Sequence, residues 1–158
     1  HITVSTCGLV PKILEFANIP MQFNLALSLH APNDKLRDEL MPINKAYKIN
    51  EVLDAIKKYY SITNRRVTIE YVMLKGVNDS MECARELCNL LKGLNVYVNL
   101  IPYNETNDGI FSKTSKNKIL EFGKYLMDNN IVVTIRKEFG SDIQAACGQL
   151  RAKEEGHD

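Results

Sequence analysis

The sequence predicts an α/β fold with a parallel sheet that forms part of a barrel. Along the chain, five short apolar runs rich in β-branched residues alternate with stretches of helical spacing, which is the order of consecutive βα units. Runs such as residues 98–101 and 131–133 are nearly all hydrophobic, as is typical of parallel strands covered on both faces. Five strands are too few to close an eight-stranded barrel. The expected architecture is therefore a partial parallel barrel whose first strands are missing.

The apolar runs and the helical stretches give each element its expected bounds. Strands are expected at residues 2–6, 23–29, 66–74, 95–101 and 131–136. Helices are expected where apolar residues recur every three or four positions, and Asn50 and Asp79 are candidate caps for two of them. The expected helices cover residues 51–62, 80–92 and 115–129, and residues 9–18 and 34–41 are further helix candidates.

A chain of 158 residues is long enough for one domain with a hydrophobic core. We expect that domain to cover residues 1–150, with the charged residues 151–158 forming a frayed tail. Because the sequence runs from His1 straight into strand-like residues, we also expect further residues of the natural protein before it. A net charge of +1 neither favours nor excludes a nucleic acid partner, since a basic face can exist within a neutral total.

No apolar run approaches the ~20 residues of a membrane span, and no secretory leader precedes the first strand. We therefore expect a cytoplasmic protein without a membrane partner. The four cysteines, Cys7, Cys83, Cys88 and Cys147, form no CxxC pair, and their thiols are expected to be free. No metal ligands are predicted within the chain.

Polar residues follow the predicted strands, where parallel α/β folds carry their chemistry. Ser5, Ser28, His30 and Asn104 stand at or just beyond the ends of the first, second and fourth strands. Cys147 follows the last strand in a loop of small residues, Ala-Ala-Cys-Gly, which lets other groups approach its sulfur. These residues predict a site at one rim of the sheet. The alternative is that the hydroxyls at the first two strand ends only cap the helices that follow.

Two further polar features have structural interpretations. Glu70 lies inside an apolar strand and needs a partner if it faces a core. Residues 75–79 are expected to form a plain loop and a helix cap.

Several of these segments resemble successive motifs of the dual-specificity radical SAM RNA methyltransferases, which methylate C2 of an adenine in 23S rRNA and, in some members, in tRNA. The resemblance is collinear and covers residues 2 to about 151, and the combination of SLHAPND with AACGQL is its most specific part. The matching segments are VSTCG (4–8), LSLHAPND (27–34), MPIN (41–44), RVTIEYVMLKGVND (66–79), NLIPYN (99–104) and TIRKEFGSDIQAACGQL (134–150).

The resemblance implies a partial (βα) barrel of the radical SAM type, of which this chain holds only the C-terminal strands. It also implies that the complete protein uses S-adenosylmethionine and a 4Fe–4S cluster. Positions that contact S-adenosylmethionine in the family are matched here by Ser5, Ser28, Leu29, His30 and Asn104.

Cys147 matches the methyl-carrying cysteine of the family. In the mechanism that the resemblance implies, its thiolate takes a methyl group from one S-adenosylmethionine, and a second one is cleaved reductively at the cluster. The 5′-deoxyadenosyl radical then removes hydrogen from the S-methyl group, and the carbon radical adds to adenine C2. Adenine C2 is electron-poor, so ordinary methyl transfer from a sulfonium should fail there, and the cofactor performs the difficult step.

The cluster motif of the family, CxxxCxxC, is absent from this chain. In the family it lies upstream of the first matching segment, as do a Gly-Glu motif for S-adenosylmethionine, the resolving cysteine and an RNA-binding domain. We therefore expect the cluster ligands to lie outside this chain and the chain alone to be inactive. The implied partners are 23S rRNA, in some members tRNA, and an external electron donor.

Three alternatives stay open at this point. Methylation at C8 of the same adenine would use the same cysteine chemistry. A thiol enzyme of the parallel-barrel type would use Cys147 as nucleophile and His30 as base, and a non-catalytic module would use its polar rim only for capping. If RNA is the substrate, basic residues near the last two loops are candidates for phosphate contacts: Lys113, Lys116, Lys118, Arg136 and Lys137.

Overall fold

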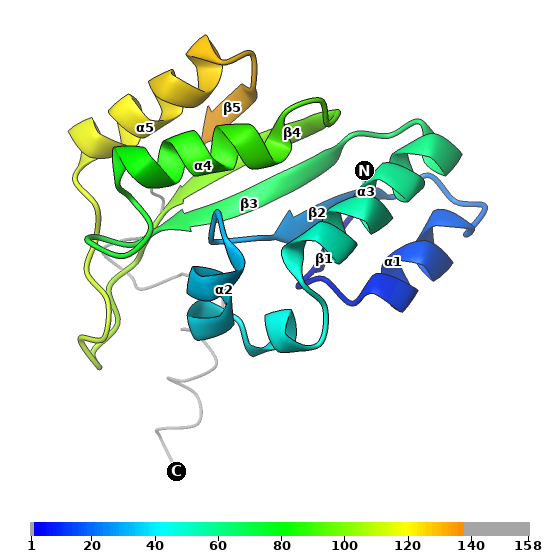
Figure 1. The fold of residues 1–158 in the computed structure, drawn as a ribbon, viewed down its shortest axis with the longest axis horizontal. Coiled ribbons are helices and arrows are strands. Elements are labelled where there is room, and N and C mark those ends of the chain that lie inside the picture. Colours follow the sequence, from blue (N-terminus) through cyan, green and yellow to red (C-terminus); the bar gives the residue numbers. More distant parts are fainter. Residues whose placement is uncertain (1, 138–158) are drawn as a thin grey trace.

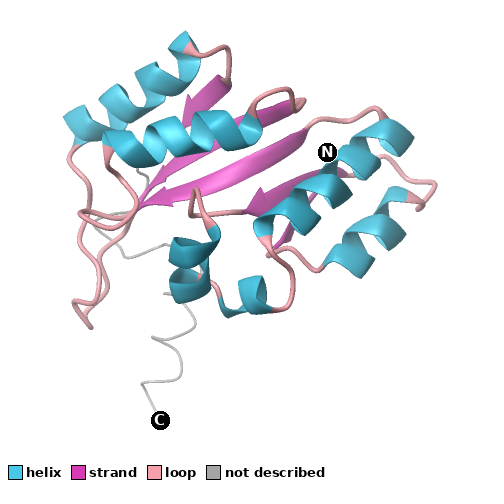
Figure 2. Ribbon diagram, viewed as in Figure 1, coloured by secondary structure: helices cyan, strands magenta, loops and turns pink. Residues whose placement is uncertain are grey.

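Five parallel strands form one sheet whose strand order follows the chain, β1-β2-β3-β4-β5. The structure is a computed structural model that describes residues 2–137 of the 158. Each strand leads through helical segments to its neighbour (Figure 1 and Figure 2). This is the predicted α/β fold, and each strand lies within one residue of its expected bounds. The strands are β1 (Thr3–Thr6), β2 (Asn24–Ser28), β3 (Val67–Met73), β4 (Val96–Pro102) and β5 (Val132–Ile135).

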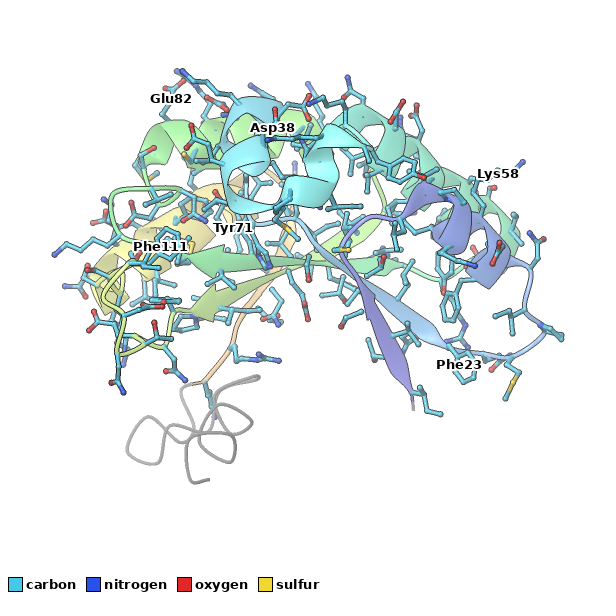
Figure 3. All side chains as sticks on the ribbon, turned by 90° about the horizontal axis from the view of Figure 1, so that it is seen from below. Phe23, Asp38, Lys58, Tyr71, Glu82 and Phe111 are labelled. Carbon is cyan, nitrogen blue, oxygen red and sulfur yellow. The ribbon has the colours of Figure 1, made fainter. Side chains whose placement is uncertain are left out.

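The helices of the described residues lie on one face of the sheet. Every connection advances by one strand in the same direction, and right-handed connections then place their helices on the same side. Figure 3 shows them above the sheet, in the arrangement of a barrel wall with its helices outside. None of these helices is both long and apolar enough for a bilayer crossing. They are α1 (Val10–Ala17), α2 (Asp34–Leu40), the short 3₁₀ helix η1 (Pro42–Lys45), α3 (Ile49–Thr63), α4 (Met81–Leu91) and α5 (Lys116–Asp128).

Side chains of β3 alternate between a helix-covered face and an open face. The odd-numbered residues, such as Ile69 and Tyr71, are fully buried, whereas even-numbered ones, such as Glu70, are only partly buried. Tyr71 packs against Phe122 of α5, with ring centroids 5.4 Å apart. Because the helices form a single layer, the prediction that the strands are buried on both faces is wrong for β1, β3, β4 and β5 within residues 2–137, whereas Leu25, Ala26 and Leu27 of β2 are all buried. We call the other side of the sheet the open face.

All five expected helices are present, with starts within two residues of their predicted positions, but neither predicted cap is used. Asn50 is not an N-cap but lies inside α3, which begins at Ile49. The first turn there is held from outside the helix, since a carboxylate oxygen of Asp34 accepts the Ile49 N–H at 2.9 Å. The cap of α4 is Ser80, which accepts a first-turn N–H at 3.1 Å. Asp79, the predicted cap, is buried and bonds elsewhere.

Candidate functional site

The carboxyl ends of the five strands meet along one rim of the sheet, at the left of Figure 1. Ser28 is the last residue of β2, and the chain then continues against β3, since the N–H groups of Leu29 and His30 both donate to the Glu70 carbonyl, at 3.0 and 3.4 Å. His30 next adopts a left-handed conformation with a φ of 60°. Three of the predicted site residues, Ser28, Leu29 and His30, therefore lie together at the rim.

A buried arginine of α2 holds this segment in place. Arg37 is 0% exposed, and its guanidinium donates to the carbonyls of Leu29 at 3.1 Å, Ser28 at 3.0 Å and Cys7 at 2.6 Å. Cys7 follows β1, so one side chain ties together the ends of β1 and β2. We call these contacts the Arg37 clamp. Gly8 makes room for it, because a Cβ there would lie 3.2 Å from Val52 and 3.4 Å from the guanidinium.

The charge of Arg37 is compensated through an amide. Burial lowers the pKa of Arg37, yet its Nη1 donates to Oδ1 of the buried Asn44 at 3.0 Å. The amide nitrogen of Asn44 in turn donates to Asp38 at 2.8 Å and to Asp34 at 3.1 Å. Hydrogen bonds from Asn44 and Lys48 lower the pKa of Asp38, which keeps this carboxylate ionised. The guanidinium is thus balanced by two carboxylates that it does not touch.

His30 is a neutral hydrogen-bond donor at the rim. Its Nδ1 accepts the Val72 N–H at 3.1 Å, which leaves the proton of the neutral ring on Nε2. Burial, together with the nearby charge of Arg37, lowers its pKa to about 4. A general base needs a free ring nitrogen lone pair at working pH, and here the backbone uses it. This geometry disfavours the pairing of His30 as base with Cys147 in a thiol enzyme.

Asn78 joins the ends of β2 and β3 from within the loop that was expected to be plain. Its Oδ1 accepts the Leu74 N–H at 2.8 Å, and its Nδ2 donates to the carbonyls of Val72 at 2.7 Å and His30 at 2.9 Å. The amide is fully buried. The Tyr71 hydroxyl donates to the Asn78 carbonyl at 2.6 Å, and burial raises the pKa of Tyr71. The sequence does not single out Asn78 or Arg37. In sequence Asn78 looks like an ordinary loop amide and Arg37 like an arginine on a helix surface, and only their contacts in the fold show their roles.

A row of polar side chains crosses the open face just below the rim. The strand register aligns Ser28, Glu70, Asn99 and Thr134 on four adjacent strands. Ser28 Oγ donates to a Glu70 carboxylate oxygen at 3.4 Å, and Thr134 Oγ1 donates to Asn99 Oδ1 at 3.2 Å. Glu70 thus lies on the open face and not in the core, and Ser28 is its hydrogen-bond partner there. Ser5 pairs in register with Ala26, two residues before Ser28, so it shares the open face and is exposed there.

The hydroxyls at the first two strand ends do not cap helices. The N-cap of α1 is Leu9, without a side-chain hydrogen bond, and the cap of α2 is Asn33, which accepts the Leu36 N–H at 2.8 Å. Thr6 Oγ1 instead accepts the Gly8 N–H at 3.1 Å inside the turn after β1. Capping therefore does not account for the polar residues at this part of the rim.

The remaining site residues occupy different situations. Asn104 lies two residues beyond β4 and is half-buried, and its side chain makes no hydrogen bond among residues 2–137. Leu29 is fully buried, so its side chain belongs to the core and only its backbone faces the rim. Cys147 lies outside the described residues, as do the rest of the 138–150 segment and the expected tail. Its role stays a prediction.

The described cysteines do not fit a 4Fe–4S cluster. Cys7 is half-buried after β1, whereas Cys83 and Cys88 are separated from it on α4. In residues 2–137 no group of three or more His, Cys, Asp or Glu side chains is placed to hold a metal. This part of the chain offers polar groups for an organic ligand, not a cage for a metal cluster.

Comparisons with known proteins find relatives along nearly the whole chain, although no family model matches it. A probable dual-specificity RNA methyltransferase RlmN from Acholeplasma laidlawii is 58% identical over 153 residues, which are 97% of this chain and 45% of the relative. The protein of the same name from Spiroplasma citri is 55% identical over 156 residues, 99% of this chain and 45% of the relative. The chain thus spans less than half the length of these relatives.

Solved structures give the same answer for the fold. A radical SAM methyltransferase from Sphaerobacter thermophilus superposes with a TM-score of 0.91 at 51% identity, covering 94% of this chain and 43% of that one. A domain of a pyruvate-formate lyase-activating enzyme from Bacteroides vulgatus has a TM-score of 0.68 at 17% identity, covering 87% of this chain and 81% of the other. The second likeness concerns the fold alone. The first confirms the predicted partial barrel of the radical SAM type.

Proposed function

We propose that this chain, which belongs by sequence and fold to the dual-specificity radical SAM RNA methyltransferases, is the part of an RNA-methylating enzyme that positions S-adenosylmethionine and carries the methyl-accepting cysteine. The observation that carries the proposal is the 58% identity along nearly the whole chain to a protein of that name, together with the TM-score of 0.91 to a radical SAM methyltransferase. A position in the C-terminal half of the complete protein fits the share of each relative that the chain covers.

The described rim suits S-adenosylmethionine, which supplies the methyl group when it is bound. The rim offers uncharged hydrogen-bond donors and acceptors for its ribose, adenine and amino acid groups. These are the hydroxyls of Ser5 and Ser28, the Nε2–H of His30 and the amide of Asn104. The low pKa of His30 keeps the ring neutral at pH 7, so the imidazole adds no positive charge that would repel the sulfonium. Leu29 would contribute through its backbone, because its side chain is in the core.

The Arg37 clamp supports this role by fixing the ligand segment before the ligand arrives. Ser28 and Leu29 are held through their carbonyls by Arg37, and His30 is held through its carbonyl by Asn78. A binding segment that is already ordered loses less conformational freedom on binding. Cys147 is assigned the methyl-carrier role by its position in the AACGQL segment.

The finer assignments within this proposal are C2 of an adenine as the target, 23S rRNA and tRNA as substrates, an external electron donor, and a cytoplasmic location. The 4Fe–4S cluster would be bound by residues outside 2–137, since the described cysteines do not fit it. The chain alone should therefore produce no methylated RNA.

The test uses the complete protein, purified anaerobically with its cluster rebuilt. It is incubated with S-adenosylmethionine, a reductant and a 23S rRNA fragment or tRNA, and the digested RNA is analysed by mass spectrometry. 2-Methyladenosine is the expected product. If 8-methyladenosine forms instead, the target atom is C8 and not C2, and the proposed cysteine mechanism is kept. If neither forms with an intact cluster and competent RNA, the methyltransferase proposal fails.

A second test replaces the proposed methyl carrier and uses another cysteine as the matched control. Cys147→Ala should abolish the product, whereas Cys83→Ala, at a half-buried thiol on α4, should leave it near the wild-type level. A Cys147→Ala protein that still forms the full amount of product would remove Cys147 from the methyl-carrier role.

A further inference from the structure

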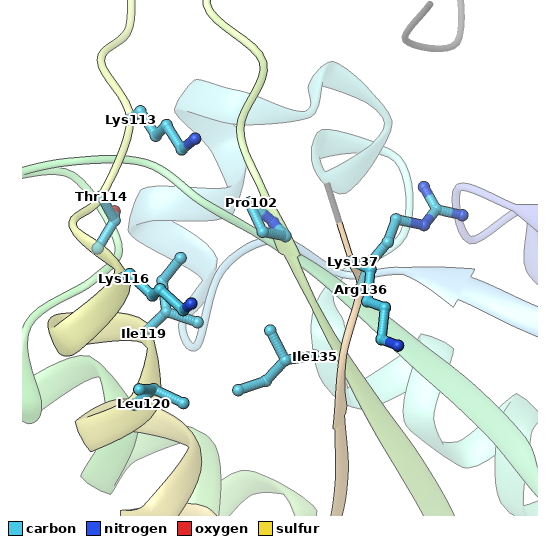
Figure 4. A pocket seen from close by; sticks show the side chains of 9 residues that line it. All are labelled: Pro102, Lys113, Thr114, Lys116, Ile119, Leu120, Ile135, Arg136 and Lys137. Carbon is cyan, nitrogen blue, oxygen red and sulfur yellow. The ribbon is translucent and has the colours of Figure 1, made fainter. Parts of the chain in front are cut away.

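A cavity at the rim lies beside the candidate site without belonging to it. It has a volume of about 330 Å³ and opens between the first turn of α5 and the ends of β4 and β5 (Figure 4). This volume is at the small end of the roughly 300–1,000 Å³ typical of ligand pockets. We call it the rim pocket. No predicted S-adenosylmethionine contact lines it, since Ser5, Ser28, His30 and Asn104 are all elsewhere.

The rim pocket combines an apolar floor with a basic margin. Pro102, Ile119, Leu120 and Ile135 supply the apolar surface. Figure 4 shows Ile119 and Leu120 on α5 and Ile135 on β5 on opposite sides of the opening. The basic margin consists of Lys113, Lys116, Arg136 and Lys137.

The fold brings these basic residues together from two separate segments. Lys113 and Lys116 belong to the loop and helix after β4, and Arg136 and Lys137 follow β5 about 20 positions later. Lys116, Arg136 and Lys137 are exposed and form no ion pair within the described part of the chain. The structure separates them from Lys118, whose ammonium lies 3.4 Å from a carboxylate oxygen of the buried Asp79. Lys118 is thus already neutralised.

We propose that the rim pocket binds one nucleotide of the RNA substrate next to the methylated adenine, with its base on the apolar floor and its phosphate at the basic margin. The inference rests on the proposed function. Proteins hold unpaired nucleotides with cations that meet the phosphate and with planar groups, aromatic rings or Arg guanidinium planes, that stack on the base. In the rim pocket Arg136 supplies both a cation and a planar guanidinium beside the apolar floor. Enzymes that act on a base taken out of its stack also contact the nucleotides that flank it, and the rim pocket offers such a contact beside the candidate site.

The first test reverses charge at the margin. Lys116→Glu/Lys137→Glu in the complete protein should weaken RNA binding roughly 10- to 100-fold at fixed salt and lower the slope of log K against log salt concentration by about 1. The matched control is Lys58→Glu/Lys92→Glu, which makes the same charge change at exposed lysines near the opposite ends of the strands. Its RNA affinity should stay within about threefold of wild type.

The second test addresses the floor. Leu120 and Met127 lie on α5 and are 49% and 50% exposed, and only Leu120 lines the pocket. Leu120→Asp should weaken RNA binding about tenfold, because the base loses an apolar contact of roughly 1.5 kcal/mol, whereas Met127→Asp should not. S-adenosylmethionine affinity, measured by equilibrium dialysis, should be unchanged in all four variants.

The outcomes separate this inference from the function on which it rests. If the wild-type enzyme methylates RNA and both pocket variants bind RNA as tightly as it does, the proposed function is unaffected, but the proposal that the rim pocket binds a nucleotide is overturned. Equal losses in the pocket variants and their controls would overturn it too, because they would reflect charge or stability in general. A wild-type protein that neither binds nor methylates RNA would overturn both.

Discussion

Replacing Arg37 with methionine should lower the free energy of unfolding by about 2–4 kcal/mol. Methionine keeps most of the volume but removes every donor. Two of the four acceptors, the Leu29 carbonyl and Asn44 Oδ1, are in fully buried hydrogen bonds, and each buried acceptor without a partner costs about 1–3 kcal/mol. The Cys7 and Ser28 carbonyls are only partly buried and can recover water. Relief from burying a charge offsets part of the loss.

The assay is urea unfolding of the 158-residue chain followed by far-ultraviolet circular dichroism, because the chain has no tryptophan. Arg85→Met is the matched control: Arg85 is 58% exposed beside Glu82, and such pairs contribute about 0–1 kcal/mol. Arg37→Lys should fall between the two, since an ammonium keeps the charge but cannot reach four acceptors. If Arg37→Met unfolds within 0.5 kcal/mol of wild type, roughly the experimental error, the clamp does not hold the strand ends.

Two further predictions concern the same rim. Folding lowers the pKa of His30 from 6.5 to about 4, so the unfolded state binds the proton more readily than the folded state. The contribution of His30 to the free energy of unfolding is therefore complete above pH 6.5 and is lost as the pH falls toward 4. In His30→Asn, whose asparagine tolerates the left-handed φ, the free energy of unfolding should depend less on pH between those values. An unchanged pH dependence would show that His30 does not cause it. Gly8→Ala should destabilise by about 1–3 kcal/mol, since it combines a φ of +109° with a Cβ 3.2 Å from Val52. Gly76→Ala, with a φ of +70° and no atom within 4 Å, should cost about 1 kcal/mol, and equal costs would mean that the contact with Val52 is unimportant.

The strands were predictable because their signal is local. Runs such as Val67–Met73 and Val96–Pro102 contain their own β-branched and apolar residues, and the structure places each strand within one residue of the expected bounds. The caps were less predictable. The sequence suggests Asn50 and Asp79, whereas α3 begins one residue before Asn50 and Ser80 caps α4. The start of α3 depends partly on Asp34, which comes from another helix.

The polar residues that shape the site were the hardest to find. Arg37 sits in the charged segment DKLRDEL and resembles a solvated helix residue, but its four acceptors lie at positions 7, 28, 29 and 44. Asn78 was read as part of a loop for the same reason. In both cases the partners are brought together only by the sheet. The burial of the strands on both faces was overestimated because apolar runs do not reveal how many helix layers cover a sheet.

The alternation along β3 separates two kinds of substitution. A change at Thr68 or Glu70 alters what the open face offers to a ligand and leaves the helix-covered core as it is, whereas a change at Ile69 or Tyr71 does the reverse. Ligand preference can therefore drift along this strand at little cost in stability. Inserting or deleting one residue inside β3 would exchange the two sets of side chains, so the strand should accept many replacements but no change in length.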